Sequence, residues 1–155
     1  MRAEQPKGEI AAALAQLLIL EQQFAANAAG VDEALEPRVY PWRPNALPEL
    51  PCIWNWLDDG TYEIVDQHRA DDLLVMRVTI GVKPSDFIEN ADRLVKLMDI
   101  FRATVDPSFE ASQPLGGTVR EAKRVVTRSH TELFDGIPVL CLETLVRLKL
   151  SAAIR

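Results

Sequence analysis

The feature that most constrains this chain is a dense cluster of prolines near its first third. Half of the ten prolines fall within fifteen residues. They are Pro37, Pro41, Pro44, Pro48 and Pro51. Because proline fixes φ and has no backbone N–H, a regular helix or a central strand is not expected here. We therefore expect residues 37–51 to form an extended arm on the surface, laid on a neighbouring molecule or wrapped around its own domain.

The segment before the arm predicts a helix over residues 8–26. It is rich in Ala, Leu, Glu and Gln, which favour helices. Ile10, Leu14, Leu17 and Phe24 recur at helical spacing and form an apolar stripe. Gly30 is a plausible stop signal.

The segment after the arm, residues 52–150, predicts a sheet interrupted by one helix. Alternating apolar residues indicate strands at 52–57, 61–65, 73–82, 118–129 and 137–150. Asp58-Asp59-Gly60 predicts a turn between the first two strands, and residues 66–72 and 130–136 are expected to be loops. An apolar stripe from Phe87 to Val105 predicts a core-facing helix that Pro107 ends.

This order of elements predicts an α+β fold. We expect a mainly antiparallel sheet with a long C-terminal hairpin, packed against two helices. The length of 155 residues suits a single domain spanning residues 1–155. Met98 and Val146 are expected in its core.

Composition argues against several classes of function. The formal net charge of −6 is unlike the basic footprint of a general nucleic-acid binder. Cys52 and Cys141 form no CxxC pair and are interpreted as buried apolar residues, so no zinc site is expected. The longest apolar stretch, residues 10–20, is too short to cross a bilayer, and we expect the chain to be made in the cytoplasm, with no membrane contact.

No motif typical of a catalytic or cofactor site is present in the sequence, so no catalytic residue, cofactor or metal ligand is predicted. One cluster of polar residues between two expected strands offers an alternative, a metal site. Its members are Asp66, His68, Asp71 and Asp72. They could bind a divalent cation in a small metal-dependent enzyme, although aspartate is also common in solvated loops.

Two groups of residues are candidates for contacts between subunits. Tyr40, Trp42, Trp54 and Trp56 are aromatic residues of a kind enriched at interfaces and equally suited to a core or to a ligand-binding surface. Arg120, Arg124 and Arg128 share one face if residues 118–129 form a regular strand. That face would be solvated, bridged to another subunit, or in contact with phosphate.

The order of elements resembles that of the small tail terminator and tail completion proteins of tailed bacteriophages, and of the related neck proteins. The resemblance covers residues 8–150 and depends on the N-terminal helix, the arm ending in Leu50-Pro51-Cys52, the mid-chain helix and the final hairpin. It implies a virion subunit that forms a ring, typically a hexamer, capping the tail tube. It also implies partners in the tail tube and the head connector, with no catalytic residues.

The resemblance leaves a head-side stopper or adaptor as an alternative role. In either ring, DNA would pass through without specific binding. We expect an acidic or neutral channel wall, because lysine and arginine would bind phosphates and slow passage. Candidate acids for the wall are Asp58, Asp59, Asp71 and Asp72.

Overall fold

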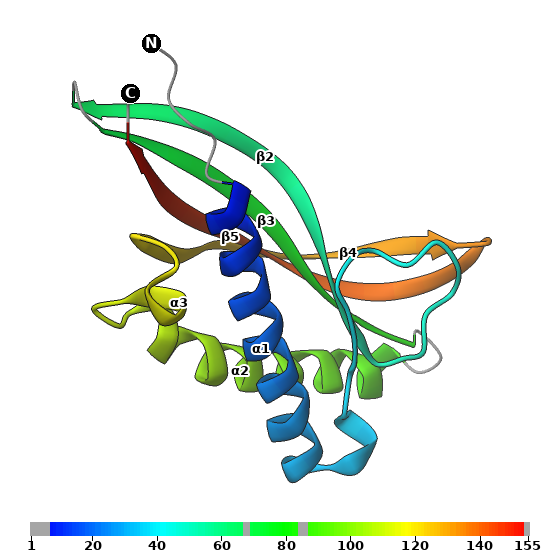
Figure 1. Ribbon diagram of the computed structural model, residues 1–155. Coiled ribbons are helices and arrows are strands. Elements are labelled where there is room, and N and C mark those ends of the chain that lie inside the picture. Colours follow the sequence, from blue (N-terminus) through cyan, green and yellow to red (C-terminus); the bar gives the residue numbers. More distant parts are fainter. Residues whose placement is uncertain (1–6, 67–68, 84–86, 154–155) are drawn as a thin grey trace.

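One strongly twisted sheet and two long helices dominate the architecture (Figure 1). The computed structural model describes residues 7–66, 69–83 and 87–153. Within this part, five strands form a sheet of order β1-β2-β3-β5-β4, and the helices pack on one of its faces. The expected α+β fold, with a mainly antiparallel sheet and a C-terminal hairpin packed against helices, is confirmed.

Both long helices extend further than the sequence predicts. Helix α1 spans Lys7–Val31 and α2 spans Phe87–Phe109. The short helix η1, Glu33–Leu35, follows α1, and the short helix α3, Pro114–Gly117, follows α2. The expectation that Pro107 ends α2 is wrong by two residues, because this proline lies inside the last turn. Phe109 is buried in the core, and its burial favours completing that turn. None of the described helices combines the length and the apolar character needed to cross a membrane.

The strands are longer than expected, and the loops between them are correspondingly shorter. They are β1, Arg38–Tyr40; β2, Cys52–Asp66; β3, Arg69–Val82; β4, Glu121–Phe134; and β5, Ile137–Ala153. All neighbouring pairs are antiparallel except β1 with β2.

The expected loop at residues 130–136 is wrong, since β4 continues to Phe134 and β5 begins at Ile137. The connection is the dipeptide Asp135-Gly136, whose φ angles are 52° and 78°. Positive φ at both positions is typical of a type I′ turn, whose twist matches that of the flanking strands. This two-residue turn sets the register of the whole C-terminal hairpin.

The expected turn at Asp58-Asp59-Gly60 is also wrong. Strand β2 runs through these residues and pairs with β3 on both sides of them, with a bulge between Leu57 and Asp59. A bulge accommodates one extra residue while the ladder continues, so the Asp-Asp-Gly sequence bends the strand instead of reversing it. Likewise, Asp66 ends β2 and Arg69–Asp72 begin β3, so this region is not a long loop.

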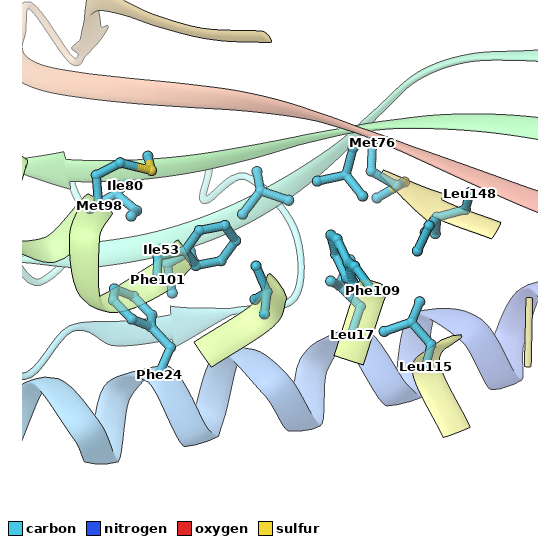
Figure 2. Close-up of a cluster of buried hydrophobic side chains, with 14 of the residues drawn as sticks. Leu17, Phe24, Ile53, Met76, Ile80, Met98, Phe101, Phe109, Leu115 and Leu148 are labelled. Carbon is cyan, nitrogen blue, oxygen red and sulfur yellow. The ribbon is translucent and has the colours of Figure 1, made fainter. Parts of the chain in front are cut away.

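The main core lies between the helices and the inner face of the sheet (Figure 2). Phe24 of α1 and Phe101 of α2 pack edge to face, with ring centroids 5.5 Å apart. Ile80 of β3 and Leu148 of β5 are buried in this core, and the expected burial of Met98 and Val146 is confirmed.

The proline-rich arm folds back on its own sheet. Its first residues form the short edge strand β1, which pairs with β2 on one side only. An edge strand tolerates nearby prolines because one side of its backbone needs no ladder partner. The hydroxyl of Tyr40 accepts a hydrogen bond from the backbone N–H of Glu49, at 3.0 Å, which closes the arm into a loop.

Candidate functional site

The outer face of the sheet, opposite the helices, contains an open cleft of about 570 Å³. Strands β2, β3, β5 and β4 supply its floor, and the proline-rich arm supplies one wall through Arg43. The lining residues are Arg43, Trp54, Trp56, Arg77, Thr79, Arg128, His130, Thr131, Glu132 and Glu143. Charged and aromatic side chains are thus concentrated at one concave place on the surface.

Strand register explains why these side chains meet. Glu143 of β5 lies between Thr79 of β3 and Arg128 of β4. Two residues before Glu143 on β5, Cys141 lies opposite His130 of β4. Because residues two apart in a strand share a face, alternate positions on three neighbouring strands point into the same cleft.

Glu143 is the electrostatic centre of the cleft, and only 7% of its side chain is exposed. Arg128 donates hydrogen bonds from Nε and Nη2 to one carboxylate oxygen, Oε1, at 3.2 and 2.8 Å. Nδ1 of His130 lies 3.9 Å from the other oxygen, Oε2. Arg77 approaches Oε1 to 3.9 Å and forms an ion pair with Asp58. Burial of the carboxylate is therefore compensated by cationic neighbours.

A second cluster lies beside Glu143 and consists of His130, Glu132 and Cys141. One potential ligand atom from each lies within 4.8 Å of the other two. Arg43 binds Oε1 of Glu132 at 3.1 Å and stacks over the ring of Phe134, 4.3 Å from its centroid. Cys141 is fully buried, and this burial raises the pKa of its thiol to about 12.

Beneath the cleft is a small second core made of Cys52, Trp54, Phe134, Val139 and Cys141. Trp54 and Phe134 pack edge to face, with centroids 5.6 Å apart. Gly81 makes this packing possible, because a Cβ there would lie 2.9 Å from a methyl group of Val139. Cys52 and Cys141 are both free and buried, as the sequence predicts.

The four aromatic candidates for a subunit interface have different environments. Trp54 is 1% exposed and is removed from the candidates, because its ring is already packed against Phe134. Tyr40 is partly buried against the second core, and its hydroxyl bonds within the arm. Trp42 and Trp56 are half-exposed, at 50% and 51%, and remain candidates for contact with another molecule.

The three arginines do not share a face. A bulge between Arg124 and Val126 shifts the alternation of β4. Arg124 therefore reaches α2, where its Nε and Nη2 pair with both carboxylate oxygens of Asp106 at 2.6 and 2.7 Å. Arg128 points into the outer cleft, and Arg120 precedes β4, with its backbone N–H bonded to Lys149. The prediction of one arginine face is wrong.

The alternative metal site predicted between Asp66 and Asp72 lies outside the described side chains. His68 lies outside the described residues, as do the side chains of Asp66, Asp71 and Asp72. Among the candidate acids for a channel wall, only Asp58 has a described side chain, and it pairs with Arg77.

Comparison with known proteins gives no further guide to function. No protein-family model matches the chain, and no curated protein sequence is similar enough to indicate a relative.

Sequence reasoning missed most of the residues that line the cleft. Glu143 falls in an expected strand with no predicted role, and His130 and Glu132 fall in the expected loop at residues 130–136. The Asp-Gly dipeptide at residues 135–136 is the signal that could have placed them, because a two-residue turn pairs His130 with Cys141 and Arg128 with Glu143.

Proposed function

We propose that this chain is a structural subunit that assembles head to tail with copies of itself. Specifically, we propose a tail terminator ring of a tailed bacteriophage, a virion component that caps the tail tube and docks to the head connector. The alternative within the same class is a stopper or adaptor on the head side of the neck. The element order of helix, arm, sheet, helix and final hairpin supports this class.

The observation that carries the proposal is a pair of open sheet edges with opposite charge. Strand β4 forms one edge of the sheet along its full length. On the other side, β1 pairs with β2 only as far as Trp54, so the rest of β2 has no outer partner within the described residues. Open edges present unpaired N–H and C=O groups that favour addition of another strand.

The charges of the two edges are complementary. Residues 57–66 of β2 contain four acids and no base, and one of these acids, Asp58, already pairs with Arg77. Residues 120–128 contain four bases and one acid. Arg124 and Arg128 already pair inside the chain, so exposed Lys123 is the base that we expect a neighbour's β2 to contact. An interface between two different edges is heterologous, and such contacts close into rings when the rotation between subunits permits.

Self-assembly is tested directly by size-exclusion chromatography with light scattering and by negative-stain electron microscopy. We expect a ring, either from the purified chain or after tail tubes are added, and we expect terminated tubes to stop growing. A ring that caps tubes supports a terminator, whereas a ring that binds only the head connector supports a stopper or adaptor. A chain that stays monomeric with both partners contradicts the proposal.

Trp56→Ala should weaken this assembly more than it weakens folding. Trp56 lies on the open part of β2, half of its surface is exposed, and it lies next to the half-exposed Leu57. Truncating an aromatic anchor at an interface commonly costs more than about 2 kcal/mol, which is roughly a 30-fold loss in affinity. The dissociation constant of the ring, from light scattering over a dilution series, is the measurement.

The matched control is Ile19→Ala on α1. Ile19 is 46% exposed and lies on α1, so this variant truncates an exposed apolar side chain outside the edge strands. We expect wild-type assembly from this variant. If Trp56→Ala assembles as tightly as Ile19→Ala does, the open edge of β2 is not the interface.

A further inference from the structure

We propose that His130, Glu132 and Cys141 form a binding site for a zinc-like divalent metal ion in the outer cleft. Their ligand atoms lie within 4.8 Å of one another, on the adjacent strands β4 and β5. Imidazole nitrogen, carboxylate oxygen and thiolate sulfur are the three ligand types that zinc takes in proteins. The site is independent of the proposed assembly role.

The geometry needs only small side-chain movements to accept the ion. Nε2 of His130 and Oε2 of Glu132 are 3.6 Å apart. Two tetrahedral ligands about 2.0–2.1 Å from zinc are roughly 3.3 Å apart, and a sulfur ligand at about 2.3 Å lies slightly further from its neighbours. The separation of these two atoms is therefore already close to what the metal requires, and rotation of the side chains covers the remainder to the sulfur.

Neighbouring residues lie beside two of the ligands. Oε2 of Glu143 lies 3.9 Å from Nδ1 of His130, beyond hydrogen-bond distance, so a small rotation of the ring is needed before Nδ1 can donate to this carboxylate. A carboxylate that accepts from Nδ1 is typical of metal-binding histidines, because it leaves Nε2 for the metal. Arg43 contacts Oε1 of Glu132, which leaves Oε2 directed to the cluster.

The third ligand explains why zinc is favoured over a hard cation. Sγ of Cys141 is buried beneath the cleft, while His130 and Glu132 are partly exposed and line it. A coordinated thiol loses its proton, and thiolate selects soft or borderline metals over calcium or magnesium. An ion held by these three residues would keep one tetrahedral position facing the cleft, open to water or to a ligand with an oxygen or nitrogen donor.

The test uses the purified, reduced full-length chain after its metal has been removed with a chelator. Zn²⁺ titration in competition with a chromophoric chelator should give one ion per chain. Co²⁺ should give the intense visible bands of tetrahedral coordination together with a thiolate-to-metal charge-transfer band. Absence of saturable binding of either ion overturns the proposal.

Two matched pairs of variants assign the ligands. Cys141→Ser should abolish the charge-transfer band and weaken Zn²⁺ binding by at least tenfold, whereas Cys52→Ser, which changes the other buried cysteine of the same small core, should retain both. His130→Asn should weaken binding likewise, and His68→Asn, at the other histidine of the chain, should not.

Replacing the buried cysteine could prevent folding and so abolish metal binding indirectly. His130 is partly exposed, so its replacement tests metal binding with less effect on folding. If Cys141→Ser fails to fold by circular dichroism, the two histidine variants decide the result. Equal binding by His130→Asn and wild type overturns the site. If His68→Asn loses binding and His130→Asn does not, the metal binds in the 66–72 region and the proposed site is wrong.

Discussion

Replacing Leu148 with aspartate should lower the free energy of unfolding by at least about 4 kcal/mol. Leu148 is fully buried on the inner face of β5, between Leu74 of β3 and Ala122 of β4. Its side chain lies with Phe109 and Leu115 in the main core (Figure 2). An unpaired carboxylate in such surroundings either stays charged without solvation or takes up a proton, and both are unfavourable. Urea unfolding followed by circular dichroism measures the change.

Leu133→Asp is the matched control on the neighbouring strand β4. This leucine is 64% exposed near the hairpin tip, so the same substitution should change the unfolding free energy by less than about 1 kcal/mol. Val146 is as deeply buried as Leu148, but it lies directly opposite Arg124, which could pair with a new carboxylate. Leu148→Asp is therefore the sharper test. An unfolding free energy close to wild type for Leu148→Asp would contradict the packing of the core.

The fold class was predictable because its signals are local and repeated. Strand β3 alternates so regularly that Leu74, Met76, Val78, Ile80 and Val82 all face the core, as the pattern indicates. The stripe of α2 is confirmed for the same reason, and both patterns report which face of an element is buried. The sequence could therefore predict two helices packed on one face of an antiparallel sheet.

Local signals failed where tertiary pairing decides the outcome. Asp58-Asp59-Gly60 has the composition of a turn, yet pairing with β3 on both sides holds it in a strand as a bulge. Pro107 should end a helix, yet α2 continues for two more residues, and the burial of Phe109 favours this continuation. In each case the local preference is on the order of 1–3 kcal/mol, which the pairing or packing of neighbouring elements can exceed.

The candidate site was less predictable than the fold, because its residues are separated in sequence and meet only through strand register. A single bulge in β4 places Arg124 against α2 and Arg128 in the cleft, although the two are four residues apart. The positions of His130 and Glu132 relative to Cys141 depend on the two-residue turn at Asp135-Gly136. Periodicity describes one strand at a time and gives no register between strands.

Glu21 should make the stability of the protein fall as the pH rises from about 5 to 8. This carboxyl group is fully buried on α1, and burial raises its pKa from 4.5 to about 8, an effect only partly offset by a hydrogen bond from Asn55 at 2.7 Å. Its other oxygen, Oε2, has no hydrogen-bond partner among the described residues. The neutral form is therefore the form that the folded protein accommodates.

The sign of the pH dependence follows from the direction of the shift. Since the folded pKa lies above the unfolded value, the stabilising contribution of the neutral carboxyl is complete below about pH 4.5 and is lost as the pH rises to about 8. Each pH unit within this window costs about 1.4 kcal/mol, and the full effect is about 5 kcal/mol. Above pH 8 the contribution of Glu21 should no longer change.

Glu21→Gln tests this expectation because it keeps the shape of the side chain and removes its titration. Urea unfolding of wild type and variant at several pH values gives a curve of unfolding free energy against pH for each. Between pH 5 and pH 8 the two curves should diverge by about 3–4 kcal/mol, with the variant favoured at the higher pH. Glu36→Gln makes the same chemical change at an exposed position, and its curve should run parallel to wild type. If the Glu21→Gln curve also runs parallel to wild type, Glu21 is ionised in the folded protein, and a cation or water must reach it between α1 and β2.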